Sequence, residues 1–229
     1  MKSVAAVVWI MVGLLLIPVA EGQSKKKGKE IPTTICTRGK LIFEDDFSAK
    51  NDEWVIQESS CTWKIARGVL ALKARSDSED SHLVISRSFS VVGGLVIEGK
   101  VAIPEGKWLY IGIDGLKPEQ AYGIIDTQSR AIAMRQMRKE GNVNVVTKNF
   151  PYAAGKPTVF LFEIINGVSA LTANGKTVSY TSSMTDGAFM GIKLYDVRKP
   201  DGSTYVFDEI KVWEALPKDE SKKKEDKGK

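Results

Sequence analysis

The most informative stretch of the chain is residues 157–180, PTVFLFEIINGVSALTANGKTVSY. Its first part is apolar at both odd and even positions, which predicts a strand buried on both faces. Asn166-Gly167 and Asn174-Gly175 then separate short β-prone runs, and Asn-Gly favours the type I′ hairpin turn because both turn residues need a positive φ. The stretch therefore predicts three consecutive antiparallel strands, with a second layer packed over their sheet.

Short β-prone runs also occupy the rest of the chain, and they are separated by Gly, Pro, Asp or Asn. They lie at residues 40–43, 54–57, 62–66, 69–73, 82–89, 95–103, 107–113, 121–126, 131–137, 143–147, 189–195 and 205–213. No window of about 11 residues has a helical period. This pattern predicts an all-β fold, a two-sheet antiparallel β-sandwich or a barrel.

The two ends of the chain differ from its middle. Residues 1–22 begin with Met1-Lys2, continue with an apolar run and end with small residues, which predicts a signal peptide; an uncleaved anchor is the alternative. In both cases the protein is secreted or otherwise extracytoplasmic, at the cell surface or in the periplasm. We expect a Lys-rich linker at 23–32, a sandwich domain at 33–216 and a charged disordered tail at 217–229.

The net charge of +5 comes from these ends. Of the 33 basic and 28 acidic residues, 11 and 6 lie outside residues 31–216, which leaves 22 of each sign within that range. A nucleic-acid-binding domain carries its positive charge on the domain, so that class of protein is excluded. The basic ends predict either solvated tails or a weak contact with an anionic cell surface. The oligomeric state stays open.

Two cysteines, Cys36 and Cys61, remain in the exported part. An even number of cysteines in an exported chain predicts a disulfide between them. Two unpaired thiols are the alternative, and no Cys/His cluster indicates zinc.

Several stretches resemble one superfamily. They are WKIARGVLAL (63–72), LVISRSFS (83–90), FLFEIINGVSALTANGKTV (160–178), GIKLYD (191–196) and VFDEIKVWE (206–214). They are similar to strands of concanavalin A-like lectin/glucanase sandwiches, and nearest to family-16-hydrolase-like domains, also described as 3-keto-disaccharide hydrolase domains. The resemblance implies a concanavalin A-like jelly roll, with one concave face that often handles sugars.

The glucanase catalytic signature of this superfamily is absent. Glu-x-Asp-x-x-Glu on one strand would direct three carboxylates into the cleft, where the chemistry needs two of them about 5 Å apart. No such spacing occurs in the chain, and Glu163 stands alone on its predicted strand. The sequence therefore argues against an enzyme of the usual glucanase mechanism.

An aromatic strand face is the candidate binding site. In residues 107–114, Leu109, Ile111 and Ile113 form one side, and the other side is formed by Trp108, Tyr110, Gly112 and Asp114. Neighbouring strands can add Tyr122, Arg135, Lys193 and Tyr195. Rings of this kind stack on pyranose C–H faces, while Arg, Lys and Asp bond hydroxyl groups. The alternative is that these aromatics pack under a loop. Trp63 and Trp213 are assigned to the core.

A second set of side chains is acidic: Asp45, Asp46 and Asp208. In many related sandwiches the first and last strands are neighbours, and carboxylates there hold a structural calcium ion. Oxygen ligands suit calcium, so the resemblance implies a possible calcium cofactor; solvated turn acids are the alternative.

Taken together, the residues and the resemblance predict an exported, non-catalytic, lectin-like β-sandwich module whose partner is a carbohydrate. A glycosidase-like enzyme of the 3-keto-disaccharide hydrolase type is the first alternative. A structural or adhesive protein-binding module is the second.

Overall fold

Both Asn-Gly pairs form the turns that the sequence predicts. In the computed structural model, φ is 48° at Asn166 and 72° at Gly167, and the second pair has φ of 43° and 80°. The turns join β11 (Thr158–Ile165), β12 (Val168–Ala173) and β13 (Lys176–Thr181) in antiparallel register. The predicted three-stranded meander is confirmed.

The structure describes residues 30–75, 83–115, 121–136, 143–181, 188–196 and 201–218. The predicted signal peptide, nearly all of the Lys-rich linker and most of the charged tail lie outside these ranges. The compact unit begins at Ile31, two residues before the predicted start of the domain. Within the described ranges, no helix is long and apolar enough to cross a membrane.

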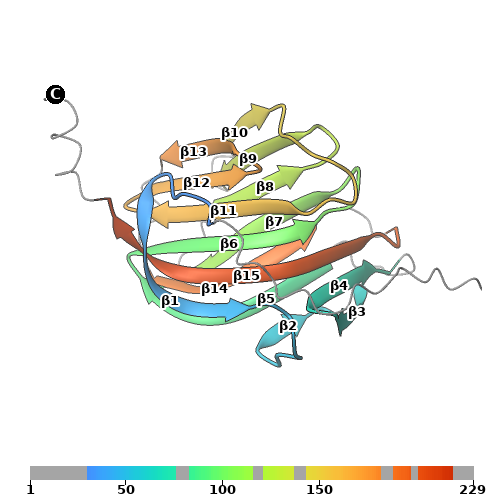
Figure 1. The fold of residues 1–229 in the computed structure, drawn as a ribbon. Helices are drawn as coiled ribbons and strands as arrows, with labels where there is room; N and C mark the ends of the chain where they lie inside the picture. The colour runs from blue at the N-terminus through green and yellow to red at the C-terminus, as the bar shows by residue number, and fades with distance from the viewer. Residues whose placement is uncertain are drawn as a thin grey trace, which may run out of the picture. The chain divides into compact units, whose positions relative to one another are not determined.

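The meander forms one edge of the first sheet, sheet A (Figure 1). Its strand order is β13-β12-β11-β6-β15-β4-β3, and β1 also pairs with β15. The further strands are β6 (Gly94–Ala102), β15 (Thr204–Pro217), β4 (Val69–Ala74), β3 (Cys61–Ala66) and β1 (Cys36–Asp45).

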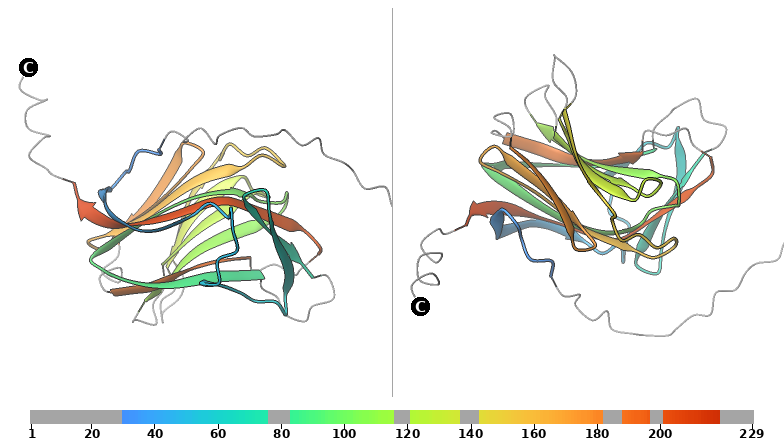
Figure 2. Two further views of the ribbon diagram at one scale, coloured as in Figure 1. Left: turned by 60° about the horizontal axis from the view of Figure 1, so that its bottom comes forward. Right: turned by 90° about the horizontal axis from the view of Figure 1, so that it is seen from above.

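The other sheet, sheet B, has the order β10-β9-β8-β7-β14-β5-β2. Its strands are β10 (Val143–Lys148), β9 (Ala131–Gln136), β8 (Ala121–Asp126), β7 (Trp108–Gly115), β14 (Ala188–Asp196), β5 (Leu83–Val92) and β2 (Trp54–Ile56). Among the described residues, every strand pairing in both sheets is antiparallel. The two sheets lie face to face as two layers (Figure 2), which confirms the predicted β-sandwich.

Strand β11 is buried on both faces, as its sequence predicts, but by two different partners. Phe160, Phe162 and Ile164 belong to the core between the sheets. Leu161 and Ile165 belong to a second apolar cluster, on the outer face of sheet A, against which Ile31 and Ile35 pack. The second cover of this strand is therefore the chain's own N-terminal segment.

Glu163 lies in this outer layer and fastens the segment to the sheet. Its carboxylate is fully buried and accepts hydrogen bonds from the backbone N–H groups of Thr34, at 2.9 and 3.0 Å, and Ile35, at 3.1 Å. The Cys36 thiol donates a further bond at 3.2 Å. A buried carboxylate needs such donors, so this lone acid has a structural role.

The predicted disulfide is not formed. Cys36 and Cys61 are both free thiols, and both are buried. Cys36 lies in the outer apolar cluster, whereas Cys61 lies in the core between the sheets. Strand alternation has placed the two thiols in different layers, where Cys36 bonds to Glu163 and Cys61 to the Gln57 carbonyl. Burial, and then the charge of Glu163, raises the pKa of Cys36 to about 12.

Candidate functional site

The two sides of β7 separate as the sequence predicts. Leu109, Ile111 and Ile113 belong to the core between the sheets. Tyr110 belongs to a separate cluster on the outer face of sheet B, and Trp108 packs against that cluster. The rings of β7 therefore point away from the core.

Strand register brings the other candidates to this face. Tyr110 pairs with Tyr195 on β14, while Gly112 pairs with Lys193 on β14 and with Tyr122 on β8. Tyr122 in turn pairs with Arg135 on β9. We call the resulting set the aromatic face; it consists of Trp108, Tyr110, Tyr122, Arg135, Lys193 and Tyr195. Asp114, the seventh candidate, pairs with Gly191 through its backbone, and its side chain lies outside the described part.

The rings of the aromatic face pack against one another. Tyr110 and Tyr195 are stacked, with centroids 4.9 Å apart and planes inclined by 23°. Tyr122 meets both of them edge-on, at 6.3 and 5.7 Å, and Trp108 lies 5.9 Å from Tyr110. Stacked and edge-to-face pairs of this kind are favourable and hold the rings in fixed positions.

Exposure divides the aromatic face into a floor and a surface. Tyr110 is 2% exposed and Tyr122 is 7% exposed, so these two rings form the floor. Trp108, Tyr195, Arg135 and Lys193 are half-buried and provide the surface that a ligand can contact. The prediction that Tyr110 shares the face is right, but its ring is covered by its neighbours.

A glycine makes this floor possible. A Cβ atom at Gly112 would lie only 2.9 Å from Cε1 of Tyr122, closer than real side chains approach. The absence of a side chain at Gly112 therefore lets the Tyr122 ring lie against the sheet.

Polar groups flank the rings. Arg135 donates from a terminal nitrogen to the Tyr110 hydroxyl at 3.3 Å and from Nε to Asn144 at 2.9 Å. The Lys193 ammonium lies 5.7 Å from the centre of the Tyr195 ring. Burial, and then Tyr122, raises the pKa of Tyr195 well above its usual value, so its hydroxyl stays neutral at physiological pH. The face thus carries positive charge and neutral hydroxyl groups beside apolar rings.

Among the described residues, Asp126 and position 114 are the carboxylate positions compared on this face, and their spacing is not that of a catalytic pair. Asp126 pairs with Trp108 and accepts bonds from the backbone N–H groups of Gln128 and Ser129. Position 114 lies six residues further along β7, which corresponds to about 20 Å of strand. Retaining and inverting glycosidases need their two carboxyl groups within about 10 Å of each other.

The predicted calcium ligands have other partners in the structure. Strands β1 and β15 are indeed neighbours. However, the Asp45 carboxylate accepts bonds from the Phe47 N–H at 2.8 Å, the Asn51 amide at 3.0 Å and the Trp54 indole at 2.8 Å. These N–H donors point at the oxygens that a cation would need.

The remaining two acids are also engaged. Asp46 accepts a bond from the Ser48 N–H, and Asp208 forms an ion pair with Lys100. Among the described residues, no group of three or more His, Cys, Asp or Glu side chains is placed to hold a metal ion. The arrangement fits calcium poorly, and the calcium ion implied by the resemblance is a hypothesis that a chelator can test.

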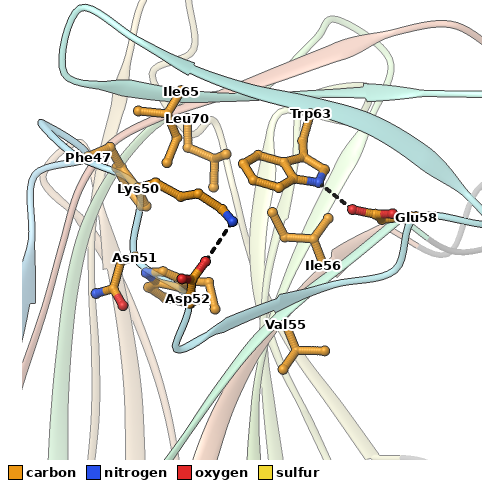
Figure 3. A pocket seen from close by; sticks show the side chains of 11 residues that line it. Phe47, Lys50, Asn51, Asp52, Val55, Ile56, Glu58, Trp63, Ile65 and Leu70 are labelled. Carbon is orange, nitrogen blue, oxygen red and sulfur yellow. Dashed lines mark hydrogen bonds and ion pairs between the residues drawn. The ribbon is translucent and has the colours of Figure 1, made fainter.

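A pocket lies apart from the aromatic face, at the edge where β2 of sheet B faces β3 and β4 of sheet A (Figure 3). It encloses about 310 Å³ and includes Trp63, which is half-buried and packs against the core, as the sequence predicts, while also lining the pocket. Its lining consists of Phe47, Lys50, Asn51, Asp52, Trp54, Val55, Ile56, Glu58, Trp63, Ile65 and Leu70. Strand alternation alone could not reveal it, because its lining comes from β2, β3, β4 and the segments that flank β2, which meet only in the folded chain.

Comparison with known proteins identifies the fold. No family model matches the chain, and no curated protein matches it. Among solved structures, the carbohydrate-binding module CBM66 of Bacillus subtilis is similar, with 12% identity, a TM-score of 0.52 and coverage of 70% of this chain and 95% of that one.

Two enzymes are similar to the same degree. The laminarinase of Rhodothermus marinus has 12% identity and a TM-score of 0.61, over 77% of this chain and 97% of its own. The β-glucanase of Bacillus licheniformis has 12% identity and a TM-score of 0.56, over 77% and 99%. The sandwich architecture and these neighbours together show that the chain has a concanavalin A-like jelly-roll fold.

Proposed function

We propose that this protein is an exported, non-catalytic carbohydrate-binding module and that its ligand lies on the aromatic face. The observation that carries the proposal is the convergence of Trp108 on β7, Lys193 and Tyr195 on β14 and Arg135 on β9, above a floor of buried tyrosines. A sugar ring has an apolar C–H face and a rim of hydroxyl groups, and this surface offers a partner for each.

The rigidity of the face favours binding. The rings are held by one another and by the bond from Arg135 to Tyr110, so little side-chain freedom is lost when a ligand arrives. Export is supported by the apolar run near the N-terminus, and the fold neighbours include a carbohydrate-binding module.

The spacing and the positions of the carboxylates support a non-catalytic function. The chain has no Glu-x-Asp-x-x-Glu segment, and the Glu163 carboxylate accepts hydrogen bonds from Thr34 and Ile35 in the N-terminal segment. On the aromatic face, Asp126 and position 114 are too far apart along β7 to act on one glycosidic bond.

Affinity electrophoresis in gels containing soluble β-1,3-glucan, mixed-linkage β-glucan or mucin tests the proposal. We expect at least one of these polymers to retard the protein. Lys193→Gln should weaken the retardation several-fold, whereas Lys176→Gln, an exposed lysine on β13, should not. Release of reducing sugar from any of the polymers, or equal effects of both variants, would contradict the proposal.

A further inference from the structure

The pocket at the β2–β3 edge combines an aromatic wall with a polar rim. Its volume of about 310 Å³ is at the lower end of the range for small-molecule sites. Its floor is apolar and includes Phe47 and Leu70, which are buried, and Ile65, which is half-buried. The pocket opens between the sheets, whereas the aromatic face lies on the outside of sheet B.

Trp63 forms the wall and its orientation is fixed. Its indole N–H donates to Glu58 at 2.9 Å, and the ring lies beside Ile56 (Figure 3). A half-buried indole held by its polar edge presents an apolar surface on which a sugar ring can stack.

The rim carries both donors and acceptors of hydrogen bonds. Lys50 Nζ lies 2.7 Å from Asp52 Oδ1, and both side chains are well exposed, at 64% and 82%. An exposed pair of this kind is weak, so both groups are able to turn to a ligand. Asn51 and Glu58 complete the rim.

The charges of the rim select among classes of ligand. Two carboxylates against one ammonium group disfavour an anion, and a cation would compete with Lys50, which already lies 5.9 Å from the Trp63 ring. A purely apolar ligand would cover the charged groups without bonding them, at a cost. A neutral polyol with one apolar face satisfies both the wall and the rim.

We propose that this pocket binds a single pyranose ring, as a second saccharide site that is independent of the aromatic face. Its size admits one ring or the end of a chain, and Trp63, Asp52 and Lys50 make the principal contacts. The proposal does not depend on the function proposed for sheet B.

Nuclear magnetic resonance of the indole N–H groups tests it in the full chain. Trp63 reports on the pocket, Trp108 reports on the aromatic face, and Trp213, buried under Arg38, serves as a control. The protein is titrated separately with D-glucose, D-galactose, D-mannose, N-acetyl-D-glucosamine and tetramethylammonium. We expect a saturable shift of the Trp63 signal with at least one sugar and none with tetramethylammonium.

Three single substitutions test which side chains of the pocket contribute to sugar binding. Trp63→Ala should weaken this sugar binding at least about fivefold. Asp52→Ala, which changes an exposed side chain and leaves the core intact, should weaken it as well, whereas Val92→Ala, an exposed valine of β5 that does not line the pocket, should not. The Asp52 variant keeps the test valid if Trp63→Ala fails to fold.

The possible outcomes separate the two proposals. The proposal that the pocket binds a sugar is overturned by any of three results: a shift of the Trp108 signal alone, a shift of the Trp63 signal with tetramethylammonium alone, or no shift at all. If sugar shifts the Trp63 signal saturably but no polysaccharide gel retards the protein, the result supports sugar binding in the pocket and refutes the aromatic-face proposal.

Discussion

Replacing Glu163 by alanine should release the N-terminal segment from the outer face of sheet A. The carboxylate is fully buried and accepts from Thr34, Ile35 and Cys36. If the segment stayed in place, two backbone N–H groups would lose their acceptor, at about 1–3 kcal/mol each. If it detached, the burial of Ile31 and Ile35 would be lost instead, at about 1–2 kcal/mol each for half-buried side chains.

The first route gives a loss of about 2–6 kcal/mol in the free energy of unfolding and the second a loss of about 2–4 kcal/mol, a large share of the roughly 5–15 kcal/mol that a domain has. Urea unfolding measures this loss. Glu163→Gln keeps one acceptor oxygen but loses the charge, so it should cost about 1–2 kcal/mol. Glu209→Ala, on the exposed side of β15, is the matched control and should change stability by less than about 0.5 kcal/mol.

Thiol labelling shows where the structure opens. In the native protein both cysteines are buried, so iodoacetamide should modify neither one quickly. In Glu163→Ala, Cys36 should react faster while Cys61, in the core between the sheets, stays protected. The reasoning is refuted if Glu163→Ala costs less than about 0.5 kcal/mol, or if the two cysteines become reactive together.

Three further predictions concern other parts of the chain. Ile111→Ala should cost about 2–5 kcal/mol because it opens a cavity between the sheets, whereas Trp108→Ala should weaken glycan retention with a much smaller loss of stability; equal losses in thermal melts would assign Trp108 to the core. A chelator should leave the melting temperature unchanged because the Asp45 oxygens already accept three N–H donors, and a clear fall would establish a calcium site. Because the pKa of Cys36 is raised from 9.0 to about 12, its contribution to stability is complete below about pH 9 and is lost as pH rises toward 12; urea melts of Cys36→Ala should lack this part of the alkaline loss, and identical pH profiles would contradict it.

Local sequence determined the strands and their faces. Asn-Gly pairs need positive φ at both positions, and this requirement is met wherever they occur in the meander. The alternation along β7 separated core from outer face correctly, because the side-chain period of a strand is two whatever the rest of the fold does. The sandwich class and the outward direction of Trp108 and Tyr110 on β7 follow from these local rules.

The contacts of individual side chains with distant parts of the chain were decided only by the tertiary structure. Which layer a cysteine enters depends on what covers each face of its sheet, so Cys36 and Cys61 lie in different layers although their even number predicted a bond. Asp45 shows the same limit: its carboxylate bonds to the Trp54 indole and two other donors brought by the turn and β2, a geometry that no spacing in the sequence encodes.

The outer apolar layer on sheet A and the pocket at the β2–β3 edge were also decided by the tertiary structure. The apolar outer face of β11 requires a cover, but only the folded chain shows that residues 31–36 supply it and that Glu163 holds them. Trp63 has the sequence pattern of a core residue and packs against the core, yet it also lines the pocket beside the three-residue strand β2. Alternation along a strand determines which side chains share a face, whereas the lengths and ends of the strands packed opposite determine whether that face is covered.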